Sequence, residues 1–468
     1  MPRIPVRAAV ALTLVLPPLL AARAQPHAQA EAQALALAQE TIALRSVQGP
    51  GNRTIDVARV YARALREAGW PERDLEIVPV DDTAFFIATW PGSDASLAPV
   101  VLSAHMDVVE ARREDWERDP FTPVVENGFL YGRGAADTKF DASLAIASAV
   151  ELRRQGFRPK RSIVIAYSGD EETTMKTSKL IADRLADAHV VLNIDSPSGV
   201  LSEQTGEPLY WQWQGAEKTY IDFELEVTNP GGHSAQPRAD NAIAQMSQAL
   251  ERISAYHFTP EQNDITRSYF AKAAAIQPNA SVAAAMRAFA ANVNDAQALE
   301  VLRADSVMIG RTGTTCVPTM VSGGHAVNAL PQRVTAIVNC RVFPGHSSAE
   351  IKAELERVAA TPEVRITDVT GDTAIASDAS PLRAEFVEAF EKSITAAWGK
   401  VPVYPTQASD ASDSMWYRAA GVPSYGASAT FIKESDDFMH GLNERIPLLN
   451  VRPGVTYYLS VLTELSSR

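Results

Sequence analysis

Short apolar runs alternate with helical stretches over residues 100–201, and this alternation limits the folds open to the chain. The runs Val100–Leu102, Ile163–Ala166 and Val190–Leu192 carry almost no polar side chain, as strands buried on both faces do. Stretches typical of helices, at residues 140–157 and 176–190, separate the runs. The alternation predicts an α/β fold with a mainly parallel central sheet flanked by helices. In such sheets, functional side chains gather beyond the carboxyl ends of the strands.

The pattern changes near Trp211, which predicts a second domain. The 468 residues are too many for one ordinary core. Residues 218–229 alternate apolar and polar side chains, like a half-exposed antiparallel strand, and further strands and helices follow. We therefore expect an inserted α+β lid or dimerisation domain with an antiparallel sheet at residues 211–372, including a helical insertion near 256–305. The catalytic α/β domain would then be discontinuous, formed by residues 25–210 and 373–468.

The first 24 residues have the pattern of a secretory signal peptide. Arg3 and Arg7 precede an apolar run, and the run ends in the small-residue pattern Ala22-Arg23-Ala24. The run is short and contains two prolines, so a permanent membrane span is the weaker interpretation. The sequence thus predicts export to a bacterial periplasm or secretion, with no membrane span after cleavage at residue 24.

Charge and cysteine content narrow the expectations further. The formal net charge of −13 argues against a nucleic-acid partner, which would call for a basic surface. Cys316 and Cys340 lie in two apolar runs that could be neighbouring antiparallel strands. In an oxidising compartment they could form a disulfide, or both could be small buried side chains.

Acids and histidines recur at the expected strand ends and in nearby loops. These candidate metal ligands and their neighbours are His105, Asp107, Asp137, Glu171, Glu172, Asp195 and His440. Each motif alone has a simpler explanation, such as a solvated turn or the start of a helix. As an ordered set, however, nitrogen and oxygen ligands without thiolates are typical of a hydrolytic zinc site that also accepts Co²⁺ or Mn²⁺.

The stretch "SGDEE" places three consecutive carboxylates after a buried strand. Adjacent like charges repel one another, and each costs free energy if it is desolvated without a partner. Divalent cations would offset this repulsion at Glu171 and Glu172. For Asp170 we expect hydrogen bonds to the backbone that shape the turn.

Several blocks of the chain together resemble the co-catalytic zinc peptidase family of glutamate carboxypeptidase, aminoacylase, succinyl-diaminopimelate desuccinylase and dipeptidases. The blocks are "SAHMDVV", "DPFTPVVENGFLYGRGAADTK", "SGDEE", "NPGGHSAQP", "NALPQRVTAIVNCRVFPG", "DSMWYRAAGVPSYG" and "HGLNERI". They follow the family's order and span about residues 40 to 460, which is nearly all of the expected mature chain.

The resemblance implies two Zn²⁺ ions, with Co²⁺ or Mn²⁺ as possible substitutes. His105, Asp137 and Asp195 would hold one ion, and Asp137 would bridge to the second ion, held with Glu172 and His440. Glu171 would act as the general base for the water between the ions and would pass the proton to the leaving amine. Asp107 would hydrogen-bond the His105 imidazole and orient it.

The resemblance also assigns residues of the inserted domain to the substrate. His233 would polarise the substrate carbonyl, often from the partner subunit of a homodimer. Asn328 and Arg341 would grip a substrate carboxylate, a task that suits the planar guanidinium. Ser412 and Asp413 fall where the family often has Thr-Asp, and the sequence assigns them no role.

We therefore expect a secreted dinuclear zinc exopeptidase that cleaves dipeptides or short peptides. Asp195 favours this substrate class, because amino- and dipeptidase-like members more often have Asp there, whereas carboxypeptidase- and deacylase-like members more often have Glu. The alternative is an N-acyl amino acid amidohydrolase or carboxypeptidase with the same site. A remote alternative is a non-catalytic binding module, against which the complete ligand set and Glu171 argue.

Overall fold

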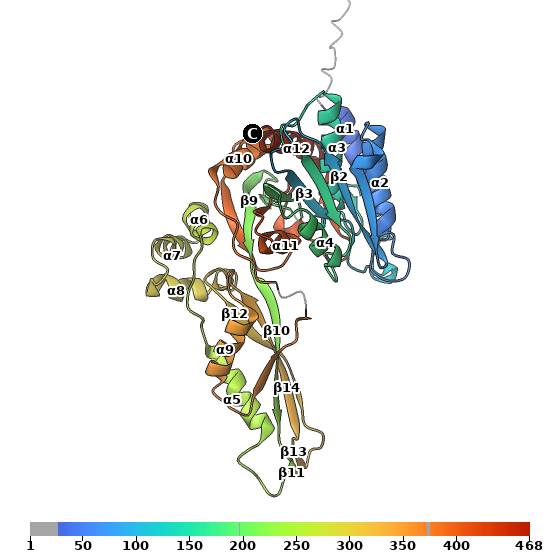
Figure 1. Cartoon of the computed structure of the whole chain (residues 1–468). Coiled ribbons are helices and arrows are strands. Elements are labelled where there is room, and N and C mark those ends of the chain that lie inside the picture. The colour runs from blue at the N-terminus through green and yellow to red at the C-terminus, as the bar shows by residue number, and fades with distance from the viewer. Residues whose placement is uncertain (1–26, 196, 372–374) are drawn as a thin grey trace, which may run out of the picture.

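A larger rounded domain and a smaller elongated domain make up the molecule (Figure 1). The structure is a computed structural model and describes residues 27–195, 197–371 and 375–468. The signal peptide expected at residues 1–24 lies outside the described residues. Within them, no helix combines the length and the apolar character needed to cross a membrane.

The larger domain is built on a ten-stranded sheet with a parallel centre. Its central strands run in the order β6 (Ile163–Ser168), β3 (Val100–His105), β7 (Val190–Asn193) and β17 (Ser424–Gly426), all parallel to their neighbours along this order. The mainly parallel sheet predicted from the sequence is thus confirmed. The flanking strands are β1 (Leu75–Val80), β2 (Thr83–Trp90), β8 (Gly199–Leu201), β9 (Pro208–Glu217), β16 (Val403–Ala408) and β18 (Phe431–Ile432).

Helices cover both faces of this sheet because its central strands are apolar on both sides. In β3, Val100, Leu102 and Ala104 join one apolar core, whereas Val101 joins the core on the opposite face. The helices of the first face are α1 (Ala28–Ile42), α2 (Thr54–Glu67), α3 (Lys139–Arg154), α10 (Ala384–Trp398) and α12 (Val451–Ser466). Those of the second face are α4 (Lys176–Arg184) and α11 (Ser414–Ala419).

The smaller domain has a four-stranded antiparallel sheet, as the sequence predicts. The strand order is β12 (Thr315–Gly323), β14 (Arg333–Val342), β10 (Thr219–Thr228) and β15 (Arg365–Asp368). Apolar side chains of β10 and β14 alternate into a core shared with α5 (Ala242–Ala255) and α9 (Ser348–Ala359). The pairing of β11 (Gly232–His233) with β13 (Ala329–Leu330) forms the far tip of this domain (Figure 1).

The chain passes between the domains at Lys218, later than the expected boundary near Trp211. Strand β9 stays in the large sheet through Glu217, and β10 begins at Thr219 in the small sheet. The helical insertion is also placed differently from the sequence-based expectation. Its helices α6 (Asp264–Ala273), α7 (Ala280–Ala291) and α8 (Ala296–Arg303) share a core with Tyr404 of β16, at the large sheet. They lie beside the larger domain instead of extending the lid (Figure 1).

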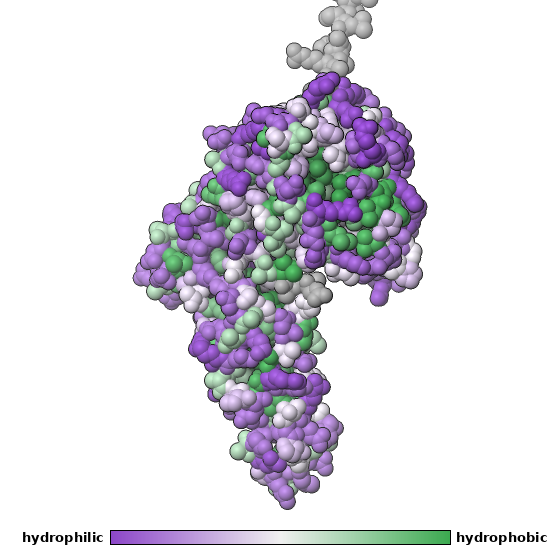
Figure 2. All heavy atoms as spheres, in the orientation of Figure 1, coloured by the Kyte–Doolittle hydropathy of each residue, from purple (hydrophilic) through white to green (hydrophobic). Residues whose placement is uncertain are grey.

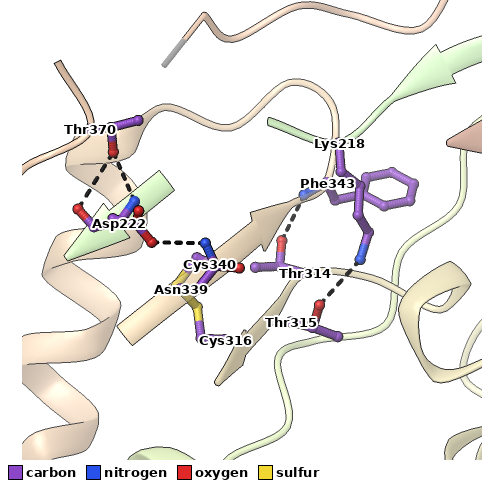
Figure 3. Close-up of a disulfide and its surroundings, with 9 residues drawn as sticks. All are labelled: Lys218, Asp222, Thr314, Thr315, Cys316, Asn339, Cys340, Phe343 and Thr370. Carbon is purple, nitrogen blue, oxygen red and sulfur yellow. Dashed lines mark hydrogen bonds between the residues drawn. A yellow bond between two sulfur atoms is a disulfide. The ribbon is translucent and has the colours of Figure 1, made fainter. Parts of the chain in front are cut away.

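A disulfide links Cys316 of β12 to Cys340 of β14 (Figure 3). The two residues are direct cross-strand partners, and 24 positions separate them in the sequence. The sequence left open whether the two cysteines form a disulfide or are simply small buried side chains, and in the structure they form the disulfide. Figure 2 shows hydrophilic side chains over much of this face, together with an apolar area on the larger domain.

Candidate active site

Three neighbouring parallel strands bring the candidate ligands together. His105 is the last residue of β3, which lies between β6 and β7. Glu171 and Glu172 follow the end of β6, and Asp195 follows the end of β7. Because the strands are parallel, their carboxyl ends meet at one edge of the sheet.

Asp137 connects two histidines from distant parts of the chain. Its Oδ1 lies 2.8 Å from Nε2 of His105, and its Oδ2 lies 3.1 Å from Nε2 of His440. Oε2 of Glu172 lies 3.0 Å from the same His440 nitrogen, and Oδ1 of Asp195 lies 3.5 Å from Nε2 of His105. The five expected metal ligands therefore form two groups that share one carboxylate.

This arrangement fits divalent metal ions. His105, Asp137 and Glu172 each offer a ligand atom, and these atoms lie within 4.8 Å of one another. Oδ1 of Asp195 is buried and has no hydrogen-bond partner among the described residues. A buried carboxylate oxygen without a partner costs free energy that a cation would offset. Imidazole and carboxylate ligands suit Zn²⁺, Co²⁺ and Mn²⁺.

The charges of the cluster shift the pKa values of its members. Burial alone would lower the pKa of His105, but Asp195 and Asp137 raise it well above its usual value. Burial and the nearby Asp137 charge raise the pKa of Asp195 to about 7. Both shifts favour protonation, which offsets part of the negative charge that bound cations would otherwise balance.

Metal binding is expected to release protons and to weaken as the pH falls. Hydrogen bonds from His440 to Asp137 and Glu172 raise the pKa of His440 to about 10 when no metal is bound. At neutral pH this imidazole therefore carries a proton that an incoming ion must displace. Zinc titrations followed by calorimetry in buffers of different ionisation enthalpy would measure the released protons. Metal affinity that does not change between pH 5 and pH 8 would contradict this prediction.

Glu171 lies beside the ligands, at the wall of a pocket. This pocket is also lined by Glu172, Met175, Tyr220, Arg341 and Met415. Burial raises the pKa of Glu171 well above its usual value, and the charges of Asp195, Asp413 and Glu172 add to this shift against the lowering charge of His105. A carboxyl group with an elevated pKa is a suitable proton acceptor and donor.

Asp107 acts differently from the role that the resemblance implies. The group hydrogen-bonded to Nδ1 of His105 is the backbone carbonyl of Asp107, at 3.0 Å, whereas the nearest carboxylate oxygen lies 3.6 Å away. The carboxylate accepts the backbone N–H groups of Glu171 and Glu172, each at 3.1 Å. Asp107 thus orients the imidazole through its backbone and holds the glutamate loop through its side chain.

Asp170 shapes the turn, as expected from the sequence. Its carboxylate accepts the backbone N–H groups of Lys176 at 2.8 Å and of Thr177 at 2.9 Å, and also the hydroxyls of Thr174 and Thr177. These bonds satisfy donors at the start of α4. Asp170, the first acid of "SGDEE", is therefore structural.

Two further carboxylates support the site, and the sequence assigned neither of them a role. Glu444 is fully buried and accepts N–H groups of the loop that carries Asp137, including Ala136 at 2.7 Å, while Arg133 pairs with it at 2.6 Å. It thus ties the His440 segment to the Asp137 loop. In the sequence, only its position in the "HGLNERI" block connects Glu444 with the site. Asp413 is buried and accepts the Ser168 hydroxyl at 2.6 Å, at the end of β6.

The structure brings Arg341, but not His233 or Asn328, to the ligand cluster. Arg341 shares the Glu171 pocket. His233 and Asn328 are exposed at the tip of the smaller domain, where the N–H of Ser234 donates to the Asn328 carbonyl at 3.1 Å. This tip lies far from the large sheet (Figure 1). Within one chain these two residues therefore do not take part in the site.

The geometry agrees with the comparisons with known proteins. The family model for peptidase family M20/M25/M40 matches residues 101–464, and the chain belongs to this family. It is 25% identical over 377 residues to a probable carboxypeptidase S-like 2 of Dictyostelium discoideum, covering 78% of this chain and 72% of the relative. It is 27% identical over 379 residues to the mouse N-fatty-acyl-amino acid synthase/hydrolase PM20D1, covering 77% of this chain and 73% of the relative. The chain is thus a metallopeptidase or related amidohydrolase.

Solved structures support the fold. The M20 metallo-carboxypeptidase Sso-CP2 of Sulfolobus solfataricus superimposes with a TM-score of 0.68 at 16% identity, covering 92% of this chain and 98% of that one. Human carnosine dipeptidase 1 gives a TM-score of 0.64 at 16% identity, with 94% and 98% covered. A dinuclear metal-binding M20 peptidase of Bacillus subtilis gives 0.58 at 13% identity, with 94% and 99% covered. The two-domain architecture is therefore that of the family.

Proposed function

We propose that this protein is an exported dinuclear zinc exopeptidase that cleaves dipeptides or short peptides. The observation that carries the proposal is the position of Asp137, whose two oxygens each face a different histidine. A carboxylate that faces two ligand groups in this way is suited to bridge two ions. Amino-terminal sequencing of the mature protein tests the export step, and a first residue other than Gln25 would contradict cleavage at residue 24.

The side chains divide the work of amide hydrolysis. His105, Asp137 and Asp195 would hold one ion, and Asp137, Glu172 and His440 would hold the other. Bound ions would supply Lewis acidity for the substrate carbonyl and a lower pKa for water. Glu171 accepts the proton of the attacking water and passes it to the nitrogen of the leaving amine. The Asp107 carboxylate keeps Glu171 in place by accepting the backbone N–H of Glu171.

Arg341 would bind the carboxylate of the leaving amino acid. Its Nη1 donates to the Ser409 carbonyl at 2.6 Å, and its guanidinium lies over the Tyr220 ring at 4.6 Å. These contacts fix the planar group in the pocket that also contains Glu171. A fixed guanidinium has donors left for a carboxylate.

A second candidate function is the hydrolysis of N-acyl amino acids. The similarity to the mouse N-fatty-acyl-amino acid synthase/hydrolase favours it, because the same site would serve an amide of either kind. The test assays zinc-loaded protein on dipeptides, on peptides with blocked carboxyl ends and on N-acyl amino acids. Full activity in the chelator-stripped protein would contradict both functions.

We also propose that a homodimer supplies His233 to the site of the partner subunit. A mixture of Glu171→Gln and His233→Ala proteins would then contain mixed dimers with one intact site each. We expect two nearly inactive proteins to recover up to about a quarter of wild-type activity after mixing and exchange of subunits. If the mixture stays inactive although mixed dimers form, His233 does not act across the interface.

A further inference from the structure

A second pocket meets the ligand cluster at Asp195, and its lining is polar. Asp195 lines it together with Gln212, Gln214, Thr406, Gln407, Ser409 and Arg311. The first pocket contains Glu171 and Arg341 instead. The second pocket reaches Arg341 at Ser409, whose carbonyl accepts from Arg341, and reaches the ligand cluster at Asp195. If Arg341 holds the leaving amino acid, this pocket is therefore within reach of the acyl side of the substrate.

Arg311 lies just after the helical insertion and forms no ion pair with an acid of the described residues. It ends the short helix η3 (Ile309–Arg311), which follows α8. Its Nη1 donates to the Thr406 hydroxyl at 2.7 Å, and its guanidinium lies over the Tyr269 ring at 4.3 Å. No carboxylate of the described chain forms an ion pair with it. The guanidinium is thus held in place by the wall of the pocket and keeps donors free for a ligand.

A buried lysine, Lys218, lies close enough to Arg311 and Arg341 for their charges to disfavour its protonation. Lys218, only 2% exposed, places its Nζ 3.5 Å from the Thr315 hydroxyl (Figure 3). Burial lowers the pKa of Lys218 to about 7, and the charges of Arg341 and Arg311 contribute to the shift against Glu261. Two carboxylates also line the pocket: Asp195, which belongs to the ligand cluster, and Asp410, which is exposed to solvent. A buried carboxylate of a ligand would therefore find its counter-charge at Arg311.

We propose that Arg311 binds a carboxylate on the acyl side of the substrate, so that the protein prefers an acidic residue there. This inference rests on the proposed function and names its substrate class. A long alkyl chain in the same pocket would cover the glutamines and Arg311 without hydrogen-bonding them, which costs free energy. The segment that follows the helical insertion thus adds specificity to the ligand cluster formed by the sheet.

The test compares substrates that share leucine as the leaving residue. We expect zinc-loaded wild-type protein to cleave glutamyl-leucine with a kcat/KM roughly ten- to a hundredfold above that of norleucyl-leucine, because a hydrogen-bonded charge would be lost. Glutaminyl-leucine should lie between them, and N-dodecanoyl-leucine should be cleaved at least about tenfold less well than glutamyl-leucine. Arg311→Gln should remove the preference for glutamyl-leucine while changing the value for norleucyl-leucine less than about threefold.

Two variants control for structural effects. Arg311→Lys keeps the charge and should retain part of the preference. Arg267→Gln changes an exposed arginine of α6 in the preceding helical insertion, paired with Asp264 at 2.9 Å, and should leave every ratio unchanged. Equal losses for glutamyl- and norleucyl-leucine in Arg311→Gln, or a wild-type preference for norleucyl-leucine, would overturn this inference alone. No cleavage of any substrate by the wild type would overturn the proposed function as well.

Discussion

Replacing Glu171 with Gln is expected to leave both metal ions bound and to remove hydrolysis. The amide has nearly the same shape but cannot accept the proton of the attacking water. The loss in kcat/KM should exceed the roughly 10²- to 10⁴-fold typical of general acid–base catalysis, because water activation fails together with proton transfer to the leaving amine. The glutamate loop should keep its place, since Asp107 holds it through backbone N–H groups. Steady-state kinetics and metal analysis on the same preparation would measure both properties.

Two further substitutions test whether Glu171 acts as a base, as a metal ligand, or in neither role. Glu172→Gln removes a carboxylate that faces His440 at 3.0 Å, so it should lower the metal content as well as the activity. Glu110→Gln changes an exposed glutamate that follows β3 and pairs with Arg45 at 2.5 Å, and it should change neither the metal content nor the activity. An active Glu171→Gln protein would refute the assignment of the base. A metal-free one would show that Glu171 belongs to the ligands.

The parallel sheet and the ligand cluster could be predicted together because they have the same cause. Apolar runs that end in His105, Glu172 or Asp195 indicate both buried strands and side chains delivered to one edge. Because β3 lies between β6 and β7 in the sheet, the side chains at the ends of these three strands lie close together. The residues alone made Asp137 and His440 candidates, and only the resemblance assigned them to particular ions. Each lies in a loop whose path depends on tertiary contacts such as those of Glu444.

Other features could not be derived from sequence periodicity. The sequence pattern of a strand such as β9 does not show whether the strand ends the large sheet or begins the small one. The domain boundary expected near Trp211 therefore lies at Lys218 in the structure. Packing of the insertion on Tyr404 depends on a contact between segments more than a hundred residues apart. The place of His233 at an exposed tip is a tertiary property as well, and its motif alone carries no information about which subunit it serves.

Replacing Asp137 with Asn should remove metal from both groups at once. The side chain keeps its volume but loses its charge and presents one oxygen, so it can serve the His105 side or the His440 side but not both. We expect less than about one metal ion per chain after dialysis and an affinity loss beyond the roughly 10- to 100-fold typical of residues that only orient ligands. Hydrolysis should fall to background. Atomic emission analysis with zinc titration would measure these changes.

Comparing Asp137 with a ligand that belongs to only one of the two groups tests whether Asp137 bridges the ions. Asp195→Asn alters a carboxylate that faces only His105, at 3.5 Å, and should lower occupancy on that side while the other ion stays bound. Asp115→Asn changes an exposed aspartate outside the ligand cluster, and this variant should keep both ions. If Asp137→Asn lost no more metal than Asp195→Asn, the two groups would not depend on a shared carboxylate. The dinuclear centre would then have to be abandoned in favour of two independent sites.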